Sequence, residues 1–548
     1  MTTFNRREIL TAFLGLPVAL AACHRTNNLP LPAGEIVGAS DVFGHRLRDV
    51  QKIDVPADAW QSIPVVIVGG GVAGLTAAWR LLKSGFNDFA LIELESTPGG
   101  TSRSGSNRLT SFPWGAHYIP APMKENQTLV SLLTEMSVIE GADHDGEPII
   151  GEQFLCRDPE ERVFYKGRWY EGLYLHAGET ENDKAQLAKF NEEVAKWVSW
   201  RDTRERRAFT IPVSACSDDP EVTALDRTSM SDWMDRRGFT SPRLRWSVDY
   251  ACRDDYGMTL EQTSAWAGLF YFCSRVAKPN IDSQPLITWP EGNGRLVNHL
   301  FDQVKERVQL DRGAAELIPV EEDGKSQVKV VTLDRNGQNP RGLKADKVIF
   351  AAPQFMARYV VQPYRDSPPQ HISEFQFGAW MVANLTLKDR PALSSRRDFP
   401  LAWDNVLYES PSLGYVVATH QRSIDRGPTV FTYYYPLCDE DPRKARSRLL
   451  ETDWAGWTDV TLTDLSRAHP DIRNLIERVD VMRWGHAMIR PRPGFIWGTA
   501  RREAAKPFRS IHFAHSELSG VALFEEAFDV GLRTADEVLR LLGLKRDL

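Results

Sequence analysis

The segment Ile63-Pro64-Val65-Val66-Ile67-Val68-Gly69-Gly70-Gly71-Val72-Ala73-Gly74 decides the fold of this chain. Its first half is a continuous apolar, β-branched run, which predicts a strand buried on both faces. Its second half has the glycine spacing GxGxxG, and residues 75–84 continue as a predicted helix that stops at Gly85. A second predicted strand, Phe89 to Ile92, ends at Glu93. This order of strand, glycine turn, helix, strand and acidic residue predicts a dinucleotide-binding βαβ unit.

The three motif glycines and Glu93 each have a physical role in this unit. Gly69 permits the tight turn, Gly71 lets backbone N–H groups approach a pyrophosphate, and Gly74 lets the helix pack closely on the strand. The helix N-terminus faces the negative charge. Glu93 is expected to accept hydrogen bonds from ribose hydroxyls, which argues against a 2′-phosphate and therefore against NADP. The cofactor-binding residues predicted from this unit are Gly69, Gly71, Val72, Ala73, Gly74 and Glu93.

Length and composition set broader limits. At about 150 residues per domain, 548 residues suggest three or four domains, and 42% hydrophobic with 25% charged residues is typical of a globular chain. The net charge of -7 and the absence of a Lys/Arg run argue against a nucleic-acid partner. The six Cys include no CxxC pair and the 12 His no HExxH, so no metal motif is present and a disulfide scaffold is not expected.

The N-terminus has the pattern of an export signal. Arg6-Arg7 precede an apolar stretch from Ile9 to Ala22, and Leu20-Ala21-Ala22-Cys23 closes it. The paired arginines resemble a twin-arginine signal, and the last four residues resemble a bacterial lipoprotein box, whose Cys is lipidated. We expect a signal over 1–23, a tether over 24–60, and an exported, periplasmic or cell-envelope protein anchored to the membrane by lipid at Cys23. The alternative is an uncleaved hydrophobic N-terminus.

Further motifs carry a family resemblance. Gly99-Gly100-Thr101-Ser102-Arg103, followed by Trp114-Gly115-Ala116-His117-Tyr118, resembles the second glycine motif of the flavin amine oxidase, phytoene desaturase and protoporphyrinogen oxidase superfamily. The resemblance implies that Gly99, Gly100 and Arg103 lie beside the FAD diphosphate. It also implies that Gly115, Ala116 and His117 lie near the isoalloxazine ring. Thr101 stands where the family has Arg, and Arg103 is the substitute.

The resemblance continues in order to the C-terminus. Strands are expected over 316–320, 328–331 and 346–353, and the resemblance implies that Val320 contacts adenine and that Ala352 lies in the last strand's cofactor-binding end. Residues 510–517 resemble the C-terminal flavin motif, in which Glu517 would bind the ribityl chain. Gly520 and Ala527 belong to the helix start that points at the flavin. His515 replaces the glycine usual in the family.

These motifs divide the chain into two interleaved domains. The expected fold class is α/β, with a Rossmann-type FAD-binding domain over 61–124, 286–365 and 481–548. The intervening segments, 125–285 and 366–480, are expected to form an α+β substrate-binding domain built on an antiparallel sheet. Helical spacing over 182–200 and a capped start at Ser229 predict helices in the first of these segments.

The resemblance also places the chemistry. His117, Tyr118 and Trp484 are candidates to line the substrate cavity, with ordinary core packing as the alternative. Alternation along a strand puts Tyr433 and Tyr435 on one face and Tyr434 on the other. One or two of these tyrosines are further candidates, with packing within the sheet as the alternative.

Two absences refine the expectation. Amine oxidases of the family carry a Lys near flavin N5, and Val382 stands about where it would fall, which favours a dehydrogenase or desaturase over a fast oxidase. No Cys follows Cys438, so the resemblance implies non-covalent FAD.

The sequence therefore predicts an FAD-dependent oxidoreductase that oxidises a C–N or C–C bond of a small or lipophilic substrate and passes electrons to an unidentified acceptor. A carotenoid- or porphyrin-type desaturase and a non-catalytic, membrane-tethered flavoprotein are the alternatives. The charged run Arg253-Asp254-Asp255 is expected on a solvated face.

Overall fold

The computed structural model describes residues 30–39, 41–49, 53–322, 324–393 and 395–544. It contains a short N-terminal unit, Met1–Pro32, and one large unit, Ala33–Leu548, to which all elements named below belong. The predicted export signal and Cys23 lie outside the described residues. Among the helices of the described residues, none is both long and apolar enough to cross a membrane.

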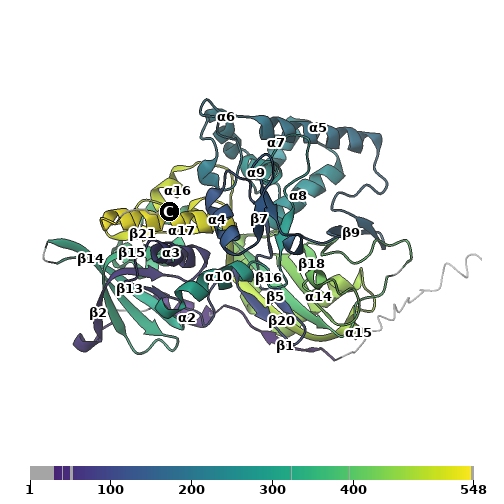
Figure 1. The fold of residues 1–548 in the computed structure, drawn as a ribbon. Helices are drawn as coiled ribbons and strands as arrows, with labels where there is room; N and C mark the ends of the chain where they lie inside the picture. The colour runs from purple at the N-terminus through teal and green to yellow at the C-terminus, as the bar shows by residue number, and fades with distance from the viewer. Residues whose placement is uncertain (1–29, 40, 50–52, 323, 394, 545–548) are drawn as a thin grey trace, which may run out of the picture. The chain divides into compact units, whose positions relative to one another are not determined.

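The glycine-turn segment forms the centre of a seven-stranded Rossmann-type sheet (Figure 1). The strand order is β12-β3-β2-β15-β14-β13, and β21 pairs with β15 in parallel. Both β3 and β15 pair in parallel with β2, whose second half is buried on both faces as the apolar run predicts. The bounds are β2 (Trp60–Val68), β3 (Phe89–Ile92), β12 (Val308–Gln309), β13 (Arg312–Glu322), β14 (Lys325–Asp334), β15 (Arg341–Phe350) and β21 (Ile511–Phe513).

Helices α3 (Val72–Lys83), α10 (Gly294–Val304) and α17 (Phe524–Leu541) cover this sheet. α3 and α17 pack together so closely that a Cβ at Gly531 would lie 2.5 Å from the Ala73 carbonyl oxygen. The N-termini of both helices therefore lie close to each other and to the end of β2.

A second sheet has eight strands in the order β1-β20-β16-β19-β18-β17-β9-β10. Its pairings are antiparallel except β1 with β20 and β17 with β9. One face packs on α13 (Pro442–Glu451) and α14 (Trp454–Ser466), and the other face contacts the segment around Trp114. The bounds are β1 (Ala33–Ile36), β9 (Glu161–Tyr165), β10 (Arg168–Glu171), β16 (Phe377–Leu387), β17 (Asp404–Leu407), β18 (Gly414–Val417), β19 (Thr429–Pro436) and β20 (Ile476–Ile489).

A helical layer follows β10 in the chain. α5 (Glu181–Ser199), α7 (Met230–Arg236), α8 (Pro242–Tyr256) and α9 (Ala265–Cys273) share one apolar core (Figure 1). Thr180 and Ser229 cap α5 and α7 with side-chain hydrogen bonds, so the helices predicted over 182–200 and from Ser229 are both present.

The predicted fold class is confirmed, with one correction to its sheet and one to the tether. The second sheet is mixed rather than purely antiparallel, because β1 and β9 add parallel pairings. Residues 33–49 are not a tether: β1 joins the second sheet, and α2 (Asp41–Asp49) buries Phe43 and Leu47 against Ala315. A single i, i+4 apolar pair is too short a pattern to reveal this from sequence.

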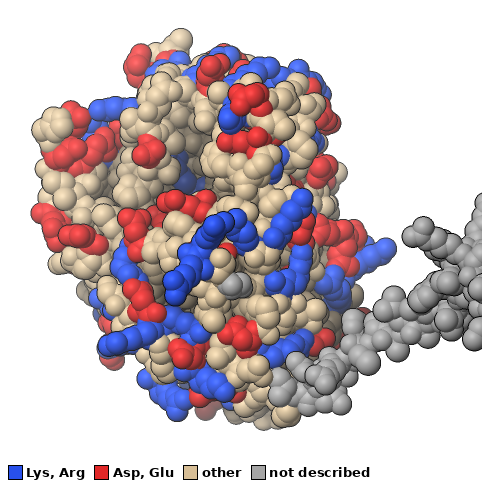
Figure 2. Space-filling model, turned by 90° about the vertical axis from the view of Figure 1, so that its right-hand side faces the viewer, with Lys and Arg blue, Asp and Glu red and all other residues tan. Residues whose placement is uncertain are grey.

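The surface mixes charges of both signs. On the face shown in Figure 2, lysine and arginine side chains are interspersed with aspartate and glutamate, and neither sign covers the face.

Candidate functional site

The glycine turn has the geometry that its spacing predicts. Gly69 has φ of +107°, a conformation that favours glycine, and a Cβ at Gly74 would lie 1.9 Å from the Gly69 carbonyl oxygen. A Cβ at Gly71 would meet no protein atom within 4 Å, although Gly71 itself lines a large cavity. The turn therefore brings a backbone edge without side chains to the cavity.

Glu93 closes this turn from the neighbouring strand. Its Oε2 accepts a hydrogen bond from the Gly70 amide at 2.5 Å, and its Oε1 accepts one from the Glu95 amide at 2.7 Å. Burial raises the pKa of Glu93 to about 7, although both amides favour the ionised form. A Cβ at Gly70 would lie 2.9 Å from Oε2, so Gly70 leaves the room that the carboxylate occupies.

A cavity of about 1200 Å³ begins at this turn. It is lined by the last residues of the three central strands, Val68, Ile92 and Phe350, so it lies at the carboxyl ends of a parallel sheet, where ligands of such folds bind. Of the predicted site residues, the cavity is lined by Gly69, Gly71, Val72, Ala73, Glu93, Gly99, Gly100, Ala116, Ala352, Trp484 and Ala527.

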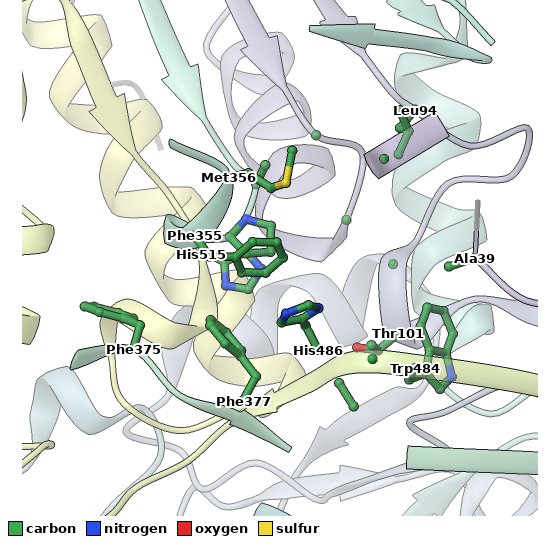
Figure 3. A pocket seen from close by; sticks show the side chains of 18 of the residues that line it. Ala39, Leu94, Thr101, Phe355, Met356, Phe375, Phe377, Trp484, His486 and His515 are labelled. Atoms are coloured by element: carbon green, nitrogen blue, oxygen red, sulfur yellow. The ribbon is translucent and has the colours of Figure 1, made fainter. Parts of the chain in front are cut away.

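The far part of this cavity is aromatic (Figure 3). Phe355 stacks on His486 with ring centroids 4.1 Å apart, and Phe377 meets both rings edge-on. Burial, with Arg446, Arg48 and His45 nearby, lowers the pKa of His486 to about 3, so the ring is neutral. Phe377 begins the strand that carries Val382, and His486 lies two residues after the predicted Trp484, whereas Phe355 belongs to no segment that the resemblance marks.

Several predicted cofactor residues lie directly behind the cavity wall. A Cβ at Gly115 would lie 2.2 Å from the Thr101 carbonyl oxygen, and Gly520 has φ of +89°. The buried Arg103 guanidinium lies 5.0 Å from the centroid of the Trp484 ring, and its Nη1 is 3.7 Å from Glu95. These positions support the wall without facing the cavity.

Glu517 is fully buried behind His515 and Ser516, which line the cavity. Its Oε1 accepts a hydrogen bond from the Gln354 amide at 2.6 Å, whereas its Oε2 has no hydrogen-bond partner. Burial raises the pKa of Glu517 to about 8. A buried carboxylate oxygen without a partner is costly and marks a place where a donor is missing.

The contact predicted at Val320 is wrong. Val320 lies near the far end of β13, whereas Arg312, Gly313 and Ala314 at the start of that strand line the cavity. The reason is the strand pairing: the Arg312 amide donates to the Glu93 carbonyl, so it is the beginning of β13 that meets the glycine turn.

The tyrosine alternation on β19 is present, but the predicted pair lies on the wrong face. Tyr433 donates a hydrogen bond to Asp464 at 2.9 Å, and Tyr435 packs with Trp457, both on the α14 side of the sheet. Tyr434 faces the site instead, and its hydroxyl donates to the Gly115 carbonyl at 2.9 Å.

His117 and Tyr118 line a second cavity of about 520 Å³, whereas the preceding Ala116 lines the first. The His117 ring stacks on Tyr434 with centroids 4.8 Å apart, and burial lowers its pKa to about 4. One short segment thus separates the two cavities. The sequence expectation of a solvated Asp254 is wrong, because Asp254 lines the second cavity and Asp255 is buried beside it.

The arrangement fits a dinucleotide in the first cavity. The glycine turn at the start of α3 offers backbone amides to a pyrophosphate, and Glu93 offers acceptors for ribose hydroxyls.

Comparison with solved structures supports the fold. A putrescine oxidase double mutant superposes with a TM-score of 0.62 at 16% identity, covering 88% of this chain and 100% of the other. Cyclohexylamine oxidase from Brevibacterium oxydans gives 0.61 at 14% identity, with the same coverage. A fatty acid isomerase from P. acnes gives 0.57 at 15% identity, covering 89% of this chain and 99% of the other.

Sequence comparisons reach only the glycine-turn region. The model of an NAD(P)-binding Rossmann-like domain matches residues 67–136. The Baeyer-Villiger monooxygenase peniC of Penicillium patulum is 41% identical over 61 residues, which are 10% of each protein. The chain therefore has a Rossmann-like domain within the fold that these oxidases and the isomerase share.

Proposed function

We propose that this protein is an FAD-dependent oxidoreductase that holds FAD non-covalently in the first cavity. The observation that carries the proposal is the position of that cavity, which runs from the Gly69–Gly71 turn and Glu93 to the start of α17. When bound, FAD would accept a hydride from the C–H bond of the carbon whose C–N or C–C bond is oxidised, in a small or lipophilic substrate.

The residues would divide the binding as follows. Gly71, Gly99 and Gly100 present backbone to the diphosphate, because none carries a side chain into the cavity. Glu93 accepts hydrogen bonds from the ribose. Glu517, behind His515 and Ser516, would hold that part of the wall in place through its hydrogen bond from the Gln354 amide. Arg103 stays behind the wall and positions Trp484.

The chain's own side chains would keep water away from one end of the bound cofactor. Phe355, Phe377 and neutral His486 line one end of the first cavity with apolar surface. Closed, apolar surroundings strengthen electrostatic interactions and prevent side reactions.

A dehydrogenase or desaturase that uses an acceptor other than dioxygen is the second candidate. Val382, at the position where amine oxidases have Lys, is buried between apolar neighbours of the second sheet. No amine is therefore available at this position to assist the reaction with dioxygen.

The test is spectroscopic. Purified protein should be yellow and should release FAD on denaturation. Under anaerobic conditions, a panel of amines and polyenes should bleach the flavin in at least one case. Colourless protein without FAD would contradict the proposal. A flavin that no organic substrate reduces, but that exchanges electrons with a protein, would favour a non-catalytic flavoprotein.

We also propose that the protein is exported and anchored by lipid at Cys23. A twin-arginine route carries folded proteins and suits a cofactor loaded before export. Fractionation of cells expressing the wild type and Cys23→Ala tests this: membrane association should be lost in the variant, and equal association of both would contradict the anchor.

A further inference from the structure

The second cavity is acidic. Glu160, Glu161, Asp254 and Asp404 line it. The Glu161 carboxylate makes no hydrogen bond or ion pair with any described residue. Asp404 accepts one hydrogen bond, from the Tyr250 hydroxyl at 3.2 Å, and Asp254 accepts a long one of 3.4 Å from Tyr118.

The one positive side chain at this cavity is already neutralised. Arg275 donates two hydrogen bonds to Asp255, at 2.9 and 2.7 Å, and both side chains are buried. It therefore leaves Glu160, Glu161, Asp254 and Asp404 without an ion pair among the described residues, and the fifth lining carboxylate, Asp282, is exposed. The face of the molecule shown in Figure 2 differs from this cavity, because positive and negative side chains are mixed on it.

These four carboxylates are half-buried, and carboxylates partly removed from water without a cation are unfavourable. Burial, with Glu160 and Asp254 nearby, raises the pKa of Glu161 to about 8. Burial and Asp255 raise the pKa of Asp254 to about 7, and burial with Glu161 and Asp254 raises that of Asp404 well above its usual range. A bound cation would relieve this repulsion.

The geometry disfavours a metal ion as that cation. Among the described residues, no group of three or more His, Cys, Asp or Glu side chains is arranged to hold one. Glu161 and Asp404 are register partners on the neighbouring strands β9 and β17, so two of the carboxylates lie side by side and can face one charged group of a ligand.

Part of the remaining wall is aromatic. Tyr118, Tyr250, Tyr271, Phe272 and Trp403 line the cavity together with neutral His117. Aromatic faces attract organic ammonium groups through cation–π interactions and also pack against alkyl chains. Carboxylates and aromatic rings together match an organic ammonium ion with an alkyl body.

We propose that the second cavity binds an organic ammonium ion between its carboxylates and aromatic walls, and that this ion is the substrate. The substrate assignment rests on the proposed function, whereas the binding does not. The two cavities are adjacent at Ala116 and His117, because Ala116 lines the cavity proposed for FAD and His117 lines the cavity proposed for the ammonium ion.

The first test uses the wild-type holoprotein under anaerobic conditions. Isothermal titration calorimetry compares hexamethylenediamine with neutral hexanediol and anionic adipate. We expect the diamine to bind at least tenfold more tightly than either analogue. Equal affinity for diamine and hexanediol would overturn the proposal without any variant.

The second test uses charge-neutral variants. Glu161→Gln and Asp404→Asn should each weaken diamine binding at least tenfold. Glu192→Gln is the matched control, because Glu192 lies on α5 beside the cavity-lining Asn191 but is itself exposed. The first two variants should also raise the thermal midpoint of the ligand-free protein, which separates lost binding from lost folding.

Flavin absorbance of the same samples separates the two proposals. Protein without FAD that still binds the diamine contradicts the proposed function and supports the ammonium site. Protein with FAD that discriminates against the diamine contradicts the ammonium site and leaves the proposed function standing. If the diamine binds and bleaches the flavin under anaerobic conditions, both the ammonium site and the substrate assignment are supported. If the diamine binds but the flavin is not bleached, the substrate assignment is overturned.

Discussion

Gly70 and Glu93 are joined by a 2.5 Å hydrogen bond from the Gly70 amide to Glu93 Oε2, across the ends of neighbouring strands. The contact leaves no room for a side chain at Gly70. The Glu93 carboxylate therefore requires a glycine at position 70. Gly69 is required by the tight turn, and Gly71 faces the cavity.

Gly70→Ala should displace the Glu93 carboxylate, because the new Cβ would lie 2.9 Å from Oε2. We expect FAD affinity to fall at least tenfold, measured by titrating the apoprotein with FAD. Gly141→Ala is the control, since Gly141 is exposed and a Cβ there meets nothing within 4 Å. Equal affinity of both variants would show that Glu93 does not hold the ribose.

Gly71→Asp should abolish FAD binding. The side chain would project into the cavity and bring a negative charge to the place proposed for the diphosphate. Absorbance of the purified protein is the measurement, and Gly141→Asp should copurify with FAD as the wild type does. A yellow Gly71→Asp protein would contradict the assignment.

The variants Tyr434→Phe and Tyr433→Phe test which face of β19 lies toward the proposed flavin site. The first variant removes the hydrogen bond to the Gly115 carbonyl, and the second removes the one to Asp464. Each should cost about 1–3 kcal/mol of unfolding free energy. Only Tyr434→Phe should shift the flavin spectrum. A spectral shift in Tyr433→Phe instead would place the site on the other face.

Arg275→Met should cost about 3–5 kcal/mol of unfolding free energy, because it leaves the buried Asp255 carboxylate unpaired. Urea denaturation measures the loss. The exposed pair of Arg108 and Glu477 is the control, and Arg108→Met should change the free energy by less than about 1 kcal/mol. Similar losses in both variants would mean that Asp255 is solvated.

Glu517 should make the protein less stable as the pH rises. Its pKa is about 8 in the folded protein against an ordinary value of about 4.5, so the unfolded chain loses the proton first as the pH rises. Between those pH values each unit costs roughly 1.4 kcal/mol. Glu517→Gln should flatten the fall in thermal midpoint between pH 5 and pH 8. A variant with the wild-type slope would contradict the raised pKa.

Local patterns predicted the backbone of the cofactor region correctly. The βαβ unit, the strands β13 to β15 and the capped helices each follow from short-range rules on apolar period, glycine spacing and capping. The glycine positions could be interpreted because their constraints come from atoms a few residues away or from the adjacent strand.

Side-chain partners distant in the sequence could not be predicted in this way. Alternation correctly separated Tyr434 from Tyr433, but only the packing of α14 decided which face was the site. Likewise, only strand pairing moved the cavity contact from Val320 to Ala314.

The sequence by itself therefore determined that the chain contains a glycine turn with an acid one strand away, and hence a nucleotide-binding fold. Only the tertiary structure decided that Asp254, Glu161 and Asp404, from three separate segments, share one cavity. The physical reason is that a motif depends on backbone geometry over a few residues, whereas the charge of a cavity depends on which distant segments the fold brings together.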